Sequence, residues 1–202
     1  LKQITNAIGG GMLKFGHDDF GNLAWAQYEN GAYDYRLPDK AGNLYKTQGA
    51  KDRKYGPGGK LLETSDARFI YDEEGNLKKK IITAAPVGGA VWEYEWYANG
   101  MLKNVVRPDG KLVEFRYDPL GRRMEKQHNG RITRFVWDGN VPLHEWTYPA
   151  QERPVVTIDE LGDISLDHPE PVPTETLATW VFEEDTFTPA AKIINGKQFS
   201  II

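Results

Sequence analysis

Residues 117–123 read Tyr-Asp-Pro-Leu-Gly-Arg-Arg, and the chain repeats this order of an aromatic residue, an Asp, two variable residues and a Gly. The Asp carboxylate of such a segment accepts a backbone N–H two residues later, and the Gly supplies a positive φ without a Cβ clash. The aromatic residue then ends one β-strand, and the residue after the turn begins the next. The segment therefore predicts the turn of a β-hairpin.

Five further segments resemble this one: residues 17–23, 38–44 and 71–77, with weaker copies at 96–102 and 108–112. Their glycines are irregularly spaced, which argues against a solenoid of fixed repeat length. We predict structural turn roles for His17, Asp18, Gly21, Asp39, Gly42, Tyr71, Asp72, Gly75, Trp96, Gly100, Asp109, Gly110, Tyr117, Asp118, Gly121, Trp137, Asp138 and Gly139.

The segments between the turns alternate as half-buried strands do. Alternate positions of residues 113–117 and of 133–137 carry large or aromatic side chains on one face. Asn-Gly and Asp-Gly pairs, such as those at 129–130 and 195–196, favour tight hairpin turns, and no segment has the period of a long helix. We predict an all-β fold, a curved strip of ten or more antiparallel strands in consecutive hairpins.

The composition agrees with short strands and turns. Aromatic residues make up 12% of the chain beside 21 Gly and 12 Pro, while the hydrophobic total is only 40%. The chain has no Cys, which excludes disulfide scaffolds, thiolate-bound zinc, iron–sulfur clusters and thiol nucleophiles. It also has no apolar stretch long enough to span a membrane. A net charge of −4 gives no footprint for nucleic acid.

Residues 149–176 interrupt the pattern with five Pro, seven acidic residues and one basic residue. Proline and acidic side chains keep a segment out of a ladder and in water, so we expect an exposed insertion loop with a short strand near 155–158. The expected organisation is a hairpin strip over 1–148, an acidic Pro-rich insertion over 149–176 and continuation of the strip over 177–202. Residues 149–202 carry −7, and residues 1–148 carry +3.

Sites for chemistry are not prominent in the sequence. The four histidines, at 17, 128, 144 and 168, lack metal-binding spacing, and no nucleophile elbow or phosphate-binding loop is present. Acidic pairs at 93 and 95 and at 183 and 184 could in principle flank a glycosidic bond, but 29 acidic residues make such pairs common. We expect no catalytic residue, metal or cofactor, and read the repeat aspartates as turn caps.

The repeats resemble the Rhs/YD-repeat family, named for its Tyr-Asp dipeptide. The resemblance is carried most specifically by residues 116–123, by Phe-Val-Trp-Asp-Gly at 135–139 and by Thr-Trp-Val-Phe-Glu at 179–183. It implies the C-terminal part of the Rhs core of bacterial polymorphic toxins, a β-strip that coils into a hollow shell around a C-terminal toxin domain. Similar shells occur in insecticidal toxin complexes and in the teneurins.

The resemblance also implies partners and a location. Expected partners are the rest of the core, the enclosed toxin domain and secretion machinery such as a type VI system, without nucleic acid or a membrane span; the open strand edges could also pair with a second copy. The family's core closes with repeated Asp-Pro-x-Gly segments around a self-cleavage site, whereas residues 118–121 are the sole copy here. We therefore expect an internal, non-enzymatic fragment of a secreted or delivered protein, with targeting signals outside it.

Two functions follow from these observations. The first is structural, a segment of a toxin-enclosing shell whose aromatic residues line or brace the wall. The second is an extracellular carbohydrate-binding repeat, in which Trp92, Trp146 and Trp180 would stack on sugar rings.

Overall fold

The computed structural model describes residues 3–5, 11–84, 89–184 and 186–201, and nearly all of its regular structure is β. Two single-turn 3-10 helices, η1 (Pro57–Gly59) and η2 (Ala150–Glu152), are the exceptions in this part of the chain. The all-β prediction is confirmed. The chain divides into two units, residues 1–91 and 92–202, and the strand β11 (Ala90–Trp96) begins just before the boundary.

The first unit holds a four-stranded sheet, a two-stranded sheet and the first strands of the largest sheet. The four-stranded sheet contains β1 (Gln3–Thr5), β2 (Met12–His17), β3 (Leu23–Gln27) and β4 (Tyr33–Tyr35) in chain order. The small sheet pairs β5 (Leu37–Pro38) with β6 (Leu44–Tyr45). The remaining strands are β7 (Arg53–Tyr55), β8 (Leu61–Thr64), β9 (Ala67–Tyr71) and β10 (Leu77–Ile82).

The second unit continues the same alternation of strand and turn. Its strands after β11 are β12 (Leu102–Val106), β13 (Leu112–Tyr117), β14 (Arg123–His128), β15 (Arg131–Asp138), β16 (Val141–Pro149), β17 (Val156–Ile158), β18 (Ile164–Leu166), β19 (Ala178–Phe182), β20 (Pro189–Ile194) and β21 (Lys197–Ser200).

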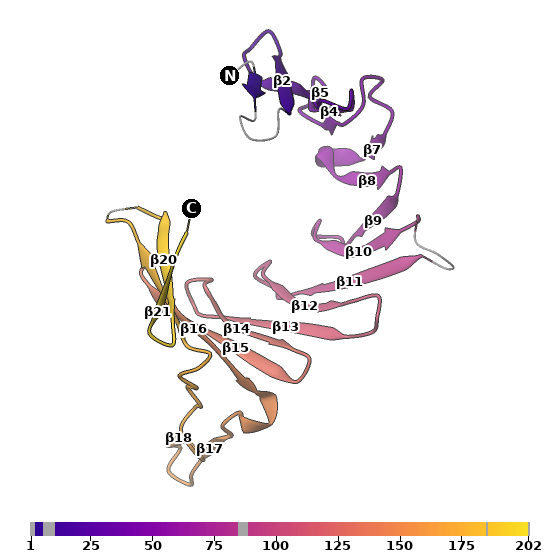
Figure 1. Cartoon of the computed structure of the whole chain (residues 1–202). Helices are drawn as coiled ribbons and strands as arrows, with labels where there is room; N and C mark the ends of the chain where they lie inside the picture. Colours follow the sequence, from indigo (N-terminus) through magenta and orange to yellow (C-terminus); the bar gives the residue numbers. More distant parts are fainter. Residues whose placement is uncertain (1–2, 6–10, 85–88, 185, 202) are drawn as a thin grey trace. The chain divides into compact units, whose positions relative to one another are not determined.

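The largest sheet has 13 strands whose spatial order is their chain order (Figure 1). It runs from β7 to β16 and then from β19 to β21, and its strand pairs are antiparallel wherever a register is defined. The break in numbering marks residues 150–177, whose strands β17 and β18 pair with each other. The sheet is open, with β7 and β21 outermost. Because neighbouring strands in the sheet follow chain order, the predicted succession of antiparallel hairpins is confirmed.

One turn recurs nine times in the described residues. The first residue donates its backbone N–H to the carbonyl of the fifth, and the fourth, a Gly with φ between +72° and +93°, donates to the carbonyl of the first. These turns begin at Asp18, Tyr28, Asp39, Gly56, Asp72, Tyr97, Arg107, Asp118 and Asp159.

A register shift accompanies several of these turns. The residue before the turn pairs with the residue that follows its fifth position, as in Tyr71↔Leu77 and Tyr117↔Arg123. The ladder then shifts by one residue next to this pair, between Leu77 and Lys79 in one hairpin and between Arg116 and Tyr117 in the other. This is the arrangement of a turn followed by a left-handed glycine, and it matches the twist of the strands that it joins.

Few side chains are fully buried in these sheets. The largest apolar cluster contains Ile132, Trp146 and Tyr148, with Ala150 and Leu177 packed against it. Ile132 pairs across the strands with Tyr148, and the neighbouring pair on the same face is Arg134 with Trp146. The centre of the second unit therefore lies on one face of β15 and β16.

Substitution of a turn glycine tests the turn. Gly121 has φ +83°, and an added Cβ would lie 2.6 Å from Cε of Met101 in the neighbouring turn. A β-branched side chain in this region should cost about 1–2 kcal/mol. Gly121→Val should therefore lower Tm by roughly 2–8 °C in a chain of this size, measured by scanning calorimetry. Gly75→Val, at φ +93°, should act in the same direction.

Gly49→Ala is the matched control, because Gly49 lacks a positive φ and nothing lies within 4 Å of an added Cβ. Its Tm should be unchanged or slightly higher. Equal Tm values for Gly121→Val and Gly49→Ala would contradict the turn.

Candidate functional site

The repeat aspartates close their turns through both carboxylate oxygens. Oδ1 of Asp72 accepts the backbone N–H of Asn76 at 2.7 Å, and Oδ2 accepts the side-chain amide of Asn76 at 3.2 Å. Asp18 and Asp39 make the same pair of contacts with the Asn four residues later. The residue after the glycine is therefore part of the cap, a role that the sequence pattern did not reveal.

Arg replaces this Asn in the turn that begins at Asp118. Arg122 donates its backbone N–H to Oδ1 at 2.9 Å and its Nε to Oδ2 at 2.6 Å. Its guanidinium also reaches the carbonyl of Gly139, which begins the next turn on the same edge of the sheet. The Arg therefore caps one turn and fastens it to another.

These hydrogen bonds stabilise the ionised aspartates. Hydrogen bonds from Asn22 lower the pKa of Asp18, and those from Asn43 lower the pKa of Asp39. For Asp72 and Asp118, desolvation raises the pKa, but hydrogen bonds from the residue four positions later outweigh it and the net direction is downward. The carboxylate form is therefore the one that the folded turns prefer.

The other predicted turn residues occupy different positions in the turns. Asp109 is the third residue of a turn that begins at Arg107, and its Oδ1 accepts the N–H of Lys111. Asp138 pairs with Val141, so the two residues between them, including Gly139 at φ +53°, form the loop. Three recurring turns are not among the predicted ones, those beginning at Tyr28, Gly56 and Asp159.

Aromatic side chains near the strand ends bind the backbone of a neighbouring hairpin. The hydroxyl of Tyr71 donates to the carbonyl of Leu61 at 2.9 Å, and Nε1 of Trp137 donates to the carbonyl of Arg123 at 2.9 Å. Tyr55 donates to the carbonyl of Leu44 in the same way. Each acceptor is the first residue after a recurring turn, so the aromatic residue joins its own strand end to the preceding turn.

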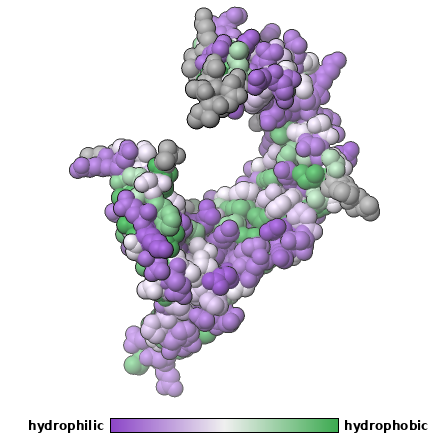
Figure 2. All heavy atoms as spheres, viewed as in Figure 1, coloured by the Kyte–Doolittle hydropathy of each residue, from purple (hydrophilic) through white to green (hydrophobic). Residues whose placement is uncertain are grey.

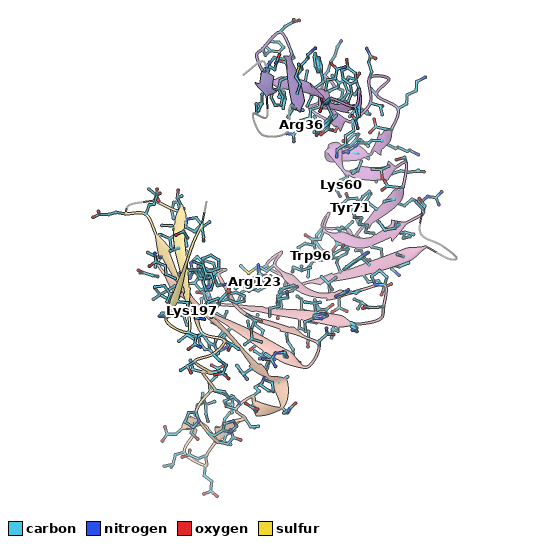
Figure 3. The ribbon with its side chains drawn as sticks, in the orientation of Figure 1. Arg36, Lys60, Tyr71, Trp96, Arg123 and Lys197 are labelled. Atoms are coloured by element: carbon cyan, nitrogen blue, oxygen red, sulfur yellow. The ribbon has the colours of Figure 1, made fainter. Side chains whose placement is uncertain are left out.

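Cationic side chains lie over several aromatic rings of the sheet. Lys60 lies over the ring of Tyr71, 5.7 Å from its centroid (Figure 3). The guanidinium of Arg123 lies 5.4 Å from the ring centroid of Phe115 and 5.6 Å from that of Phe135. Arg123, on β14, thus joins a ring of β13 to a ring of β15 through cation–π contacts.

Residues 149–176 return to the sheet through a buried carboxylate. Glu125 on β14 is 5% exposed, and its Oε2 accepts NH1 of Arg134 at 3.2 Å. NH2 of Arg153 pairs with Oε1 of Glu125 and also donates to Oε1 of Gln127 at 2.9 Å. Arg153, the basic residue of the acidic segment, therefore attaches its beginning to β14.

The end of the segment is attached to the same cluster. Glu170 accepts both Nε and NH2 of Arg134, at 2.6 and 2.9 Å, and also the hydroxyl of Tyr148 at 2.6 Å. Burial and the Glu170 carboxylate together raise the pKa of Tyr148, so its hydroxyl remains a donor. We call Glu125, Arg134, Tyr148, Arg153 and Glu170 the insertion clamp.

Two further contacts extend the clamp along β16. Nε1 of Trp146 donates to the carbonyl of Pro171 at 2.8 Å. Oγ1 of Thr176 donates to the carbonyl of Thr147 at 2.9 Å and accepts its N–H at 3.2 Å. Residues 149–176, expected as an exposed loop, thus combine a packed base with a projecting β17–β18 hairpin.

The three tryptophans considered for sugar stacking lie in different surroundings. Trp146 is 8% exposed and belongs to the apolar cluster. The ring of Trp180 is half-buried beneath Lys192, whose Nζ lies 4.5 Å from its centroid, and Arg107 lies 5.9 Å from the ring of Trp92. The structure therefore does not gather the three rings into one exposed platform.

The described residues provide neither a metal-binding cluster nor a membrane-spanning helix. No group of three or more His, Asp or Glu side chains there is arranged to hold a metal ion. None of the described helices has the length and apolar character needed to cross a bilayer.

A family model, the Teneurin YD-shell, matches residues 12–144. This is about two thirds of the chain, and it contains eight of the nine recurring turns. The chain belongs to the YD-shell family.

Two bacterial relatives are similar over part of the chain. The probable deoxyribonuclease RhsB of Dickeya dadantii (strain 3937) is 33% identical over 106 residues, which cover 52% of this chain and 7% of that protein. The double-stranded DNA deaminase toxin A of Burkholderia cenocepacia (strain H111) is 32% identical over 143 residues, covering 64% of this chain and 10% of that protein. The chain thus spans a tenth or less of the length of these relatives.

Solved structures of toxin complexes are also similar. The Tc holotoxin pore of Photorhabdus luminescens matches with a TM-score of 0.46 and 10% identity, over 92% of this chain and 9% of that one. A TcdB2-TccC3 structure without the hypervariable C-terminal region matches with a TM-score of 0.38 and 12% identity, over 90% of this chain and 13% of that one.

The lowered pKa values of the turn aspartates predict a stability that depends on pH. A carboxyl group whose pKa is lower in the folded chain than its ordinary value of 3.8 stabilises the fold above that pH, and this contribution is lost as the pH falls through the folded pKa. The double variant Asp72→Asn/Asp118→Asn should therefore melt below the unmodified chain at neutral pH, and the gap should close below about pH 4.

Thermal melts from neutral to strongly acidic pH measure this gap. Asp19→Asn is the control, because in the described structure the Asp19 side chain makes none of the hydrogen bonds of the turn that contains it. It should show no gap at any pH. A gap for the double variant that stays constant into acid would exclude the charged form as its cause.

Removal of one arginine should release the insertion. Arg134→Met removes an ion-pair partner from the buried Glu125 and from Glu170. It should therefore lower the free energy of unfolding by about 3 kcal/mol. It should also speed hydrogen exchange of the backbone amides near Thr176. Chemical denaturation and hydrogen–deuterium exchange measure the two effects.

Arg116→Met is the matched control, since Arg116 also faces Glu125, at 3.6 Å, but its side chain is 61% exposed. It should change the unfolding free energy by less than about 1 kcal/mol. If the two variants lost equal stability, the clamp would have no special role.

Proposed function

We propose that this chain is a segment of the wall of a β-shell, and that the shell of the parent protein encloses a C-terminal toxin domain until it is delivered to a target cell. The observation that carries the proposal is the succession of antiparallel strands, in chain order, through a 13-stranded sheet in a member of the YD-shell family. A sheet that grows one hairpin at a time can extend to enclose a volume.

The names of the relatives support a role in holding a cargo domain. One relative is named a deoxyribonuclease and another a DNA deaminase toxin, and both share this segment with the chain. A segment common to proteins named for different reactions is better suited to holding a cargo than to performing either reaction. We therefore assign no catalysis to this chain.

Confinement by such a wall is steric. Backbone ladders close the wall between strands, and the Asp and Arg caps keep each turn in one conformation. The hydroxyl of Tyr71 and the indole of Trp137 each bind a strand end to the preceding turn. The partners in this proposal are the remainder of the shell, the enclosed domain and the machinery that secretes them.

Protease protection in the full-length parent protein tests the proposal. The C-terminal domain should resist chymotrypsin within the parent and be cut at least about tenfold faster when it is expressed alone, because enclosure excludes the protease. Gly75→Val/Gly121→Val in the parent should restore cutting by loosening the wall, whereas Gly49→Ala should not. A C-terminal domain cut equally fast inside and outside the parent would refute enclosure.

A further inference from the structure

The β17–β18 hairpin has one apolar and one polar face. The cross-strand pairs Val156↔Leu166 and Ile158↔Ile164 lie on the same face because alternate residues of a strand point the same way. The pair between them, Thr157↔Ser165, lies on the opposite face, where the two hydroxyls are 2.7 Å apart. The hairpin is therefore amphipathic.

In the part of the chain that the structure describes, the apolar face is largely exposed. Val156, Ile158, Ile164 and Leu166 are between 51% and 73% exposed, and Leu161 in the turn is 88% exposed. In Figure 2 hydrophobic residues reach the surface at the lower end, where Figure 1 labels β17 and β18. A cluster of large aliphatic side chains this exposed marks an interaction site more often than a solvent-facing surface.

Hydrogen bonds at both ends of the hairpin stabilise its conformation, and the apolar side chains take no part in them. Its turn is the recurring one, in which Oδ1 of Asp159 accepts the N–H groups of Leu161 and Asp163, both at 2.9 Å. At the open end, Oδ1 of Asp167 accepts the N–H of Val155 at 2.8 Å. These hydrogen bonds and the insertion clamp at the base restrict the conformations of the hairpin, and a restricted binding element loses less entropy on binding.

The negative charge of the hairpin selects the partner. Residues 154–168 contain four carboxylates, Asp159, Glu160, Asp163 and Asp167, and no Lys or Arg. A second copy would bring the same negative hairpin, and an anionic lipid surface would also repel it. A partner with Lys or Arg around an apolar surface would gain both hydrophobic burial and charge complementarity.

We propose that the β17–β18 hairpin is a docking element for a protein partner whose contact surface is apolar and rimmed by basic side chains. The contact is made by the face of Val156, Ile158, Ile164 and Leu166, and the carboxylates set its preference for positive charge. This docking role does not depend on the enclosure of a toxin domain.

A pair of labelled peptides tests the proposal with the 202-residue chain. One probe alternates Val with Lys, and the other carries Glu in place of each Lys. Fluorescence anisotropy should show binding of the Lys probe that weakens with added salt, and at least about tenfold weaker binding of the Glu probe.

Variants of the two faces locate the contact. Ile158→Thr/Ile164→Thr keeps residues that favour strands but removes the apolar surface, so it should weaken binding of the Lys probe at least about tenfold. Thr157→Ser/Ser165→Thr alters the polar face alone and should bind as the unmodified chain does. Hydrogen exchange of the hairpin amides verifies that both variants retain the hairpin. Glu160→Gln/Asp163→Asn should reduce both the affinity and its dependence on salt.

Four results would overturn the proposal. They are no binding of the Lys probe, equal binding of both probes, and equal binding by the two face variants. The fourth is an occupant of another kind, shown by self-association in sedimentation, or by binding to phosphatidylcholine vesicles, that Ile158→Thr/Ile164→Thr abolishes.

Discussion

The carboxylate-capped turn with a left-handed glycine is the constraint on which both units depend. In these sheets few side chains are fully buried, so a deep apolar core cannot fix which strand pairs with which. The turns set the register instead: the turn with its positive-φ glycine sets the pair Tyr117↔Arg123, and the rest of the ladder between β13 and β14 continues from that pair after a one-residue shift. An error of one residue there would exchange the two faces of the strands on either side.

The turns also act on one another, which gives the repeats a cooperativity that single hairpins lack. Met101 in one turn lies against Gly121 in another, and Arg122 passes from Asp118 to the carbonyl of Gly139. The aromatic residues add contacts of the same range, from one strand end to the preceding turn. Each hairpin is therefore braced by its neighbours, as a wall built from thin sheet requires, because an isolated two-stranded hairpin is only marginally stable in water.

The sequence was sufficient for the features that local chemistry determines. Period-two alternation and the Asp-x-x-Gly pattern predicted the strands and most turns, since the residues involved lie within five positions of one another. The insertion clamp could not be predicted in this way, because Arg134 and Glu170 are 36 residues apart in the chain and are neighbours only in the folded structure. A sign of it lies on β15, where Ile132 and Arg134 face away from the large side chains at alternate positions of 133–137, and Ile132 is 0% exposed. An apolar residue on that face implies a cover, which residues 149–176 supply.

The clamp explains how the same segment can be ordered at its base and uncovered at its tip. Three arginines surround Glu125, and Arg134 pairs with Glu125 and Glu170 at once, so the buried charges are compensated and the base has one preferred arrangement. Ion pairs and hydrogen bonds stabilise this arrangement of the base, and the aliphatic residues of β17 and β18 take no part in it. The apolar face of the hairpin does not pack against the sheet, so it is available for contact with another surface.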